Sequence, residues 1–317
     1  MGNIGIPTVD MALFQNGSEE ERREFIKDLG KAYEDVGFVA VVNHGVDERE
    51  VHRFYDLVQA FFALPDEVKK RYEIPGLFGQ RGYTSFGREH AKGSDAPDLK
   101  EFYQIGQTVA PDDELRAEYP DNVPVKELPE FLETGVKLFK NFEESGSRLL
   151  QAIALFLGLD EHYFDTWVER GNSILRAIHY PPITSEPKSS IRAEQHEDIN
   201  LITLLVGASA EGLQVQTLDG KWVNVMAPEG YIVVNVGDML QRLTNGRLRS
   251  TTHRVVNPPR ERWHTHRYSI PFFLHPRSDM PLNVLDTCIS DERPPAFSDI
   301  TAGEYLDERL REIGLKK

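Results

Sequence analysis

Residues 196–203 read His-Glu-Asp-Ile-Asn-Leu-Ile-Thr, within a run, 193–206, whose length and apolar residues predict a β-strand. Side chains alternate between the two faces of a strand, so His196 and Asp198 project from one face and Glu197 from the other. An imidazole and a carboxylate on the same face can supply two ligands to one metal ion. Taken alone the pattern is weak, because a histidine and an aspartate in a strand more often make structural hydrogen bonds.

His253 is a candidate third ligand, in the strand-like segment 250–255 farther along the chain. Two histidines and one carboxylate leave about three positions open on an octahedral ion, the donor set typical of non-haem Fe(II) oxygenases. Farther on, Arg267 and Ser269 share one face of another predicted strand, and a guanidinium beside a hydroxyl can bind a buried carboxylate. A bare Arg-x-Ser is more often a surface charge, but all five residues in this order form a much rarer pattern. The pattern favours an iron site beside an anchor for an acidic ligand.

Longer motifs around these residues resemble the plant-type 2-oxoglutarate-dependent dioxygenases and isopenicillin N synthase. The resemblance extends over nearly the whole chain and includes the N-terminal half. The matching segments are Tyr180-Pro-Pro, the run from His196 to Thr203, Gly212-Leu-Gln-Val, the runs from Asn235 to Gly246 and from Ser250 to Asn257, Gly37-Phe, Asn43-His-Gly-Val and Asp98-Leu-Lys-Glu.

The resemblance implies a mainly β fold with flanking α-helices and a double-stranded β-helix (jelly-roll) core. It implies Fe(II) bound by His196, Asp198 and His253, and it assigns Arg267 and Ser269 to the distal carboxylate of 2-oxoglutarate. The implied reaction uses O2 and couples oxidative decarboxylation of 2-oxoglutarate, to succinate and CO2, to C–H oxidation of a small-molecule substrate by hydroxylation or desaturation. Ascorbate is a candidate reductant, and no catalytic residue beyond the metal ligands is expected.

Two features depart from the family pattern. The interval between His253 and Arg267 is longer than usual, and the histidines in it, His264 and His266, are interpreted as rim residues of an extended hairpin rather than ligands. Tyr180 occupies a position that helps hold the cosubstrate in some members and a substrate carboxylate in others. Plant members often carry Asn two positions before this tyrosine, where the present chain has Ile178. How the inner carboxylate of 2-oxoglutarate is supported therefore stays open.

Many short strand-like runs separated by turn signals follow residue 172, a rhythm that by itself suggests a double-sheet jelly roll. We expect residues 1–170 to form the helical N-terminal region packed on the core, 171–280 the jelly-roll domain and 281–317 a C-terminal helical extension. The loop 76–98 is expected to be either a lid over the substrate or an ordinary surface loop. Of the adjacent residues Phe272 and Phe273, alternation along a strand predicts that Phe273 is the one that faces inward, toward the substrate.

The composition limits the binding partners and the cellular compartment that we expect. With 36 basic and 51 acidic residues the formal net charge is −15, which disfavours a broad surface for nucleic acid or anionic membrane. One cysteine, Cys288, rules out an intrachain disulfide and a CxxC metal site. No signal peptide or long apolar run is evident, so a cytoplasmic enzyme is expected. Composition leaves the oligomeric state open.

Three alternatives remain from the sequence. An isopenicillin N synthase-like Fe(II) oxidase would use no 2-oxoglutarate, and its Arg267 and Ser269 would bind a substrate carboxylate. A non-catalytic ligand-binding module could keep the fold without the chemistry, although such proteins usually lose a ligand or the anchoring arginine. A zinc hydrolase would leave Arg267 and Ser269 unexplained. Formation of succinate separates the 2-oxoglutarate-dependent enzyme from the oxidase.

Overall fold

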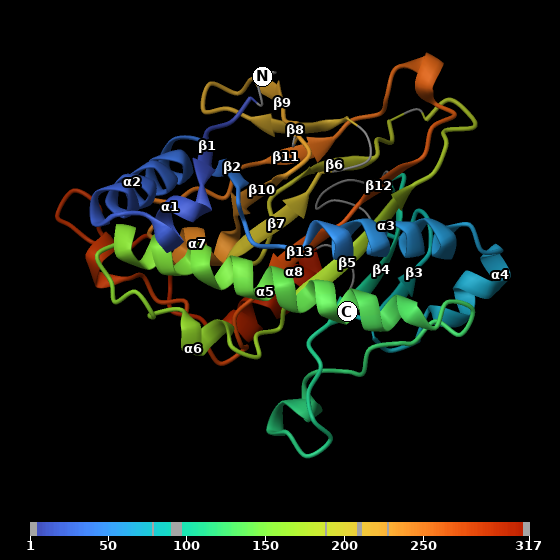
Figure 1. Ribbon diagram of the computed structural model, residues 1–317, viewed down its shortest axis with the longest axis horizontal. Coiled ribbons are helices and arrows are strands. Elements are labelled where there is room, and N and C mark those ends of the chain that lie inside the picture. The colour runs from blue at the N-terminus through green and yellow to red at the C-terminus, as the bar shows by residue number, and fades with distance from the viewer. Residues whose placement is uncertain are drawn as a thin grey trace.

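The computed structural model describes residues 5–77, 79–89, 97–187, 189–207, 211–226 and 228–312. Three layers are visible in Figure 1: a small sheet, a large sheet that faces it, and helices on the outer side of the large sheet. The mainly β fold with flanking helices that the sequence predicts is confirmed.

The large sheet has the strand order β1-β2-β10-β7-β13-β5-β4-β3, with β12 also paired to β5. The small sheet has the order β6-β11-β8-β9. All pairs in both sheets are antiparallel except β1 with β2. The strand bounds are β1 Thr8–Asp10, β2 Phe38–Val42, β3 Gly82–Thr84, β4 Glu101–Gly106, β5 Ile174–Tyr180, β6 Ala193–His196, β7 Ile202–Val206, β8 Leu213–Gln216, β9 Trp222–Asn224, β10 Tyr231–Val236, β11 His253–Val255, β12 Arg267–Ser269 and β13 Pro271–Leu274.

Helix α5 is the longest helix of the described chain and runs across the outer face of the large sheet beside α3 (Figure 1). A capping box opens α2, where Ser18 and Glu21 satisfy each other's backbone N–H groups. The helix bounds are α1 Met11–Asn16, α2 Glu19–Asp35, α3 Glu48–Phe62, α4 Asp66–Lys69, α5 Glu130–Phe156, α6 Asp165–Val168, α7 Asp238–Leu243 and α8 Ala302–Glu312, with 3-10 turns at Lys70–Tyr72, Glu114–Ala117, Arg260–Arg262 and Asp286–Cys288.

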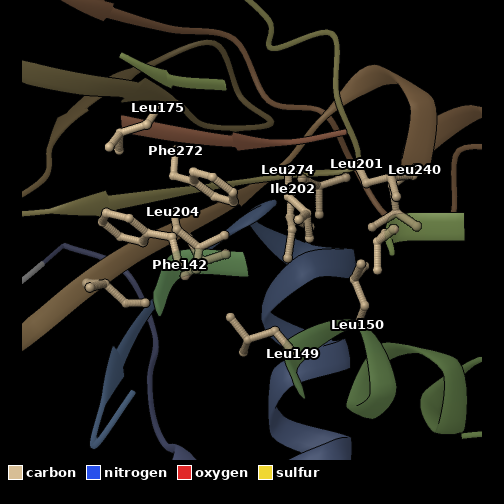
Figure 2. Packing of buried hydrophobic residues seen from close by; sticks show 14 of the residues in the cluster. Phe142, Leu149, Leu150, Leu175, Leu201, Ile202, Leu204, Leu240, Phe272 and Leu274 are labelled. Carbon is tan, nitrogen blue, oxygen red and sulfur yellow. The ribbon is translucent and has the colours of Figure 1, made fainter. Parts of the chain in front are cut away.

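The main core lies between α5 and the large sheet, as Figure 2 shows for part of it. Leu138, Phe142 and Leu149 recur at helical spacing and form the buried face of α5. Phe142 stacks on Phe272 of β13, with ring centroids 5.4 Å apart and an interplanar angle of 7°. Burial of such large aromatic and aliphatic side chains fixes the large sheet against the helix layer.

The opposite face of the large sheet is turned toward the small sheet and is more polar. In β10, Ile232 and Val234 enter the main core, while Asn235 lines a cavity between the sheets. In β13, Phe272 enters the core and Phe273 lines the cavity, so the prediction for Phe273 is confirmed. The alternation of side chains along these strands therefore separates a packed face from a face that can hold a site.

Strands from the N-terminal half extend the same sheet as strands from the C-terminal half. β2 pairs with β10, and β4 pairs with β5 along its whole length. The predicted division at 1–170, 171–280 and 281–317 stays a prediction, but the sheet is continuous across residue 170. The expected C-terminal helix is present as α8 as far as Glu312. Among the described residues, no helix combines the length and the apolar character needed to cross a bilayer.

Candidate active site

His196, Asp198 and His253 meet in the space between the two sheets. His196 ends β6 and His253 begins β11, and the antiparallel register places the two histidines directly opposite each other. Their Nε2 atoms lie 4.0 Å and 3.8 Å from Oδ1 of Asp198. Candidate ligand atoms of all three residues lie within 4.8 Å of one another, and the described residues contain no second group of this kind.

Both imidazoles are oriented by backbone carbonyl groups. Nδ1 of His196 lies 2.7 Å from the carbonyl oxygen of Glu194, and Nδ1 of His253 lies 3.1 Å from that of Thr251. If Nδ1 donates these hydrogen bonds, each Nε2 carries a lone pair aimed at the common centre, as a metal-binding histidine requires. Burial and the neighbouring His253 lower the pKa of His196 below its ordinary value, so its ring is neutral at neutral pH. The donor set therefore fits a divalent transition-metal ion.

The carboxylate of Asp198 is held by two neighbours. Its Oδ2 accepts hydrogen bonds from Oγ1 of Thr203 at 2.6 Å and Nδ2 of Asn235 at 2.8 Å, which leaves Oδ1 facing the histidines. Burial alone would raise the pKa of Asp198, but the two histidines and these hydrogen bonds outweigh it and lower the pKa. Thr203 and Asn235 were within the quoted motifs, yet only the folded chain shows that they support the carboxylate.

Arg267, Ser269 and Tyr180 line the same cavity as the three candidate ligands, and the cavity has a volume of about 540 Å³. Arg267 pairs with Tyr180 in the β12–β5 ladder, and its guanidinium lies 4.8 Å from the centre of the tyrosine ring. Ser269 pairs with Ile178, which also lines the cavity and offers no side-chain hydrogen bond there. The structure thus brings together all six residues singled out from the sequence.

Arg192 is a second buried cation in this region, and the sequence analysis missed it. Its guanidinium lies 5.9 Å from the Tyr180 ring, and its Nε has no hydrogen-bond partner among the described residues. Burial and repulsion from Arg267 lower the pKa of Arg192 to about 10. An arginine four positions before His196, directly before the predicted strand 193–206, was the available signal. Two guanidinium groups near one tyrosine make this end of the cavity suited to an anion.

His264 and His266, which were predicted to be rim or hairpin residues and not ligands, do not line the cavity. His264 is exposed, and Nδ1 of His266 lies 2.8 Å from Nε2 of His179, on the ladder face opposite Arg267. The interval that contains them holds the 3-10 turn Arg260–Arg262.

The loop 76–98 is described only in part, since residues 78 and 90–96 lie outside the described residues. Gln80, Glu89 and Asp98 from this segment line the cavity. Arg81 and Tyr83 are instead buried in the fold, and Tyr83 donates a hydrogen bond to Glu101. The loop therefore contributes wall residues to the cavity, although Arg81 and Tyr83 are not among them.

Acid is expected to destabilise the metal-free protein through His275, which lines the cavity. Burial lowers the pKa of His275 to about 4, whereas a histidine in the unfolded chain titrates near 6.5. Between these values only the unfolded state takes up the proton, so stability falls as the pH drops from about 6.5 toward 4. The loss due to His275 at pH 5, relative to pH 8, should be about 2 kcal/mol. In denaturant unfolding at pH 8 and pH 5, a His275→Gln variant should lose about 2 kcal/mol less stability than the unmodified protein. Equal losses in the two proteins would contradict this role of His275.

Comparison with known proteins gives matches over both halves of the chain. A family model described as the non-haem dioxygenase in morphine synthesis N-terminal region matches residues 6–127, and one described as the 2OG-Fe(II) oxygenase superfamily matches 171–276. The proline hydroxylase buaE of Petromyces alliaceus is 33% identical over 96% of this chain and 98% of its own length.

Solved structures give the same picture for the fold. A 2OG-Fe(II) oxygenase family protein from Caulobacter crescentus superimposes with a TM-score of 0.88 at 43% identity, covering 97% of this chain and 99% of its own. A full-length Neurospora crassa protein in complex with alpha-KG and thymine gives a TM-score of 0.85 at 31% identity, covering 96% of each chain. These likenesses, with the two facing sheets, confirm the jelly-roll core that the resemblance implies.

Proposed function

Because the chain belongs to the 2OG-Fe(II) oxygenase superfamily, we propose that His196, Asp198 and His253 hold its Fe(II) ion. We further propose that Arg267 and Ser269 bind the distal carboxylate of 2-oxoglutarate, with Tyr180 beside it. The chain is an Fe(II)- and 2-oxoglutarate-dependent dioxygenase that couples decarboxylation of this cosubstrate to C–H oxidation. The single observation that carries the residue assignments is that the three candidate ligands and Arg267 line one cavity.

The chemistry that bound Fe(II) supplies is the O2-dependent oxidation of 2-oxoglutarate to succinate and CO2, coupled to oxidation of the substrate. The residues of the chain position the reactants and exclude water. Thr203 and Asn235 keep one oxygen of Asp198 occupied, so that the other faces the metal. Arg267 is 1% exposed. Because its guanidinium is shielded from solvent, it binds a carboxylate strongly and in a fixed orientation.

The test of this function is the stoichiometry of the cosubstrate. Protein loaded with Fe(II) should form one succinate for each 2-oxoglutarate consumed, and a true substrate should raise the rate above the background without substrate. O2 uptake that needs no 2-oxoglutarate would favour the oxidase alternative. Binding of ligand with no O2 consumption would favour the non-catalytic module. The relatives named as 2-oxoglutarate-dependent enzymes support the first outcome.

Asn235→Ala is expected to weaken Fe(II) binding about 10–100-fold, the usual cost of removing a group that orients a metal ligand. The substitution removes one of the two hydrogen bonds to Oδ2 of Asp198 and frees that carboxylate to rotate. Anaerobic Fe(II) titration of the variant measures the change. Asn224→Ala, on the exposed face of β9, is the matched control and should bind iron normally. Equal iron affinity in both variants contradicts the role given to Asn235.

The partner is proposed to be a small molecule, because the candidate ligands line a cavity of about 540 Å³ and do not lie on a flat surface. The structurally similar Neurospora crassa protein was solved in complex with thymine, and the Petromyces alliaceus relative is named a proline hydroxylase. Proteins 31% and 33% identical to this chain are thus associated with small molecules. A cytoplasmic location, expected from the composition, is retained as a proposal.

A further inference from the structure

We infer that the substrate of this oxygenase is an uncharged small molecule that presents amide-like N–H and C=O groups. The inference rests on the proposed function and adds the chemical class of the substrate. It comes from a difference between two groups of polar side chains that line the cavity. One group is charged and the other is neutral. Four of the charged side chains there are paired with one another. Of the others, Arg309 pairs with Glu312 and Asp238, and Glu197 accepts a hydrogen bond from Thr252. The polar side chains without a hydrogen bond or ion pair are neutral.

The substrate end of the cavity can be located from the strand register. Along the β12–β13 segment, Arg267 and Ser269 face the cavity first, followed by Pro271, Phe273 and His275. Because a strand rises about 3.3 Å per residue, Phe273 lies roughly 20 Å along the strands from Arg267. The cavity therefore has room for a second molecule beyond the site proposed for 2-oxoglutarate.

Four charged side chains form a compensated network along the cavity wall. It extends from Lys100, which precedes Glu101 and lies level with Tyr180 across the β4–β5 ladder, to Arg176, whose guanidinium lies 5.2 Å from the centre of the Phe273 ring. Nζ of Lys100 lies 2.9 Å from Oε1 of Glu89 and 2.8 Å from Oδ2 of Asp98. Nη1 of Arg176 lies 3.3 Å from Oε2 of Glu89. Burial disfavours ionisation of Glu89, but Lys100 and Arg176 outweigh it and lower its pKa to about 2. Two cations and two carboxylates thus neutralise each other within the described part of the wall.

These charged groups are also held in place by the surrounding fold. Nε of Arg176 donates to Oε1 of Gln104 at 2.8 Å, and Gln104 donates to the carbonyl oxygen of Gly79. Oδ1 of Asp98 accepts from the backbone N–H of Glu194 at 3.0 Å. A charged substrate group would have to displace a member of this network. Because breaking a buried ion pair is costly, such binding is expected to be weaker by about 100-fold.

The uncommitted polar groups are of a different kind. Gln80, Asn172 and His275 line the cavity, and their side chains make no hydrogen bond to a described residue. Two are amides, each with a donor and an acceptor, and the third is an imidazole whose pKa burial lowers to about 4, so it is neutral at neutral pH. Phe273 and Ile174 add apolar surface beside them. Such a set matches a molecule with amide-like donors and acceptors and no charge.

The inference is tested with the holoenzyme and pairs of compounds of similar size. Thymine is paired with orotate, and 2-pyrrolidinone with L-proline, within a fragment set in which each uncharged lactam, imide or amide has carboxylate and amine counterparts. Anaerobic titration follows the change that each compound causes in the visible band of the Fe(II)–2-oxoglutarate complex. Uncharged members should bind at least about tenfold more tightly than their charged counterparts. Charged counterparts that bind equally or better, or a failure of every uncharged member to bind, overturn the inference.

A variant that removes one negative charge from the network tests whether the network causes the preference for uncharged compounds. Glu89→Gln leaves Lys100 and Arg176 with only one carboxylate and should shift the preference toward anions, raising the affinity for orotate relative to thymine about tenfold. An unchanged ratio contradicts the role given to the network. The visible band of the Fe(II)–2-oxoglutarate complex, recorded before any compound is added, tests the proposed function independently of this inference. Its absence means that the proposed function has failed, whereas a normal band with a preference for charged compounds refutes only this inference.

Discussion

Replacing His253 with alanine is expected to abolish Fe(II) binding and to lower succinate formation by at least about 100-fold. Loss of a group that merely orients a metal ligand costs up to about 100-fold, and the loss of a ligand should cost no less. Nε2 of His253 lies 3.8 Å from Oδ1 of Asp198, opposite His196, and among the described residues only these three form a group of candidate metal ligands. Iron content after anaerobic loading, together with succinate formation, measures the effect.

The matched control for this variant is His264→Ala. His264 is an exposed histidine eleven residues farther along the chain, outside the cavity lining. It should leave iron content and succinate formation unchanged. His253 also packs edge-on against Phe38, with ring centroids 5.4 Å apart, so thermal unfolding of both variants must be compared. A folded His253→Ala protein that retains one tightly bound iron contradicts the assignment of this ligand.

Arg267→Ala is expected to raise the dissociation constant for 2-oxoglutarate by about 100-fold or more. Removing one partner of a buried charge pair costs about 3–5 kcal/mol, and each 1.4 kcal/mol corresponds to a factor of ten in affinity. Arg267 is 1% exposed, so solvent screens its charge only weakly and the carboxylate interaction that the substitution removes is strong. Anaerobic titration of the Fe(II)-loaded protein with 2-oxoglutarate gives the constant directly and does not require knowledge of the substrate.

Arg262→Ala is the control, because Arg262 is an exposed arginine in the same interval and pairs with Glu211. Its 2-oxoglutarate affinity should equal that of the unmodified protein. Arg267→Lys should give an intermediate affinity, since lysine keeps the charge and loses the planar fork of donors. Unchanged cosubstrate binding in Arg267→Ala would refute the carboxylate anchor and would favour a substrate role for this arginine.

Local strand periodicity predicted part of the site. The alternation rule placed Arg267 with Ser269, and Phe273 toward the cavity, because a strand projects its side chains alternately wherever it lies. The prediction of one strand over 193–206 was wrong: β6 ends at His196, β7 begins at Ile202 in the other sheet, and Asp198 lies in the connection between them. His196 and Asp198 therefore meet because the chain turns there and not because they share the face of a strand. The identity of the metal and the cosubstrate came from resemblance to a family, since spacing alone does not distinguish iron from zinc.

Strands β3 and β4 were not predicted from the sequence, for a physical reason. Segment 101–106 contains Glu101 and Gln104, which are polar and depleted in buried strands. Glu101 is nevertheless buried, because Lys69 and His179 reach it with contacts of 2.9 Å and 2.7 Å. These partners are distant in the sequence, so no local pattern shows that the charge will be compensated.

The substrate end of the cavity was unpredictable for the same reason. Glu89, Lys100 and Arg176 come from a loop, the approach to β4, and β5, and each would be read locally as a surface charge. Only the pairing of β4 with β5 brings them into one network. Arg192 escaped notice in the same way, because its position beside Tyr180 depends on the packing of the two sheets.

The central claim is that His196, Asp198 and His253 bind one Fe(II) ion that also binds 2-oxoglutarate. The most direct measurement is anaerobic titration of the protein with Fe(II) in the presence of 2-oxoglutarate, followed by the visible charge-transfer band of the chelate. We predict a band that saturates at one iron per chain and is lost when any one of the three residues is replaced by alanine. A band of unchanged intensity in any of these three folded variants, or no band in the unmodified protein, would contradict the claim.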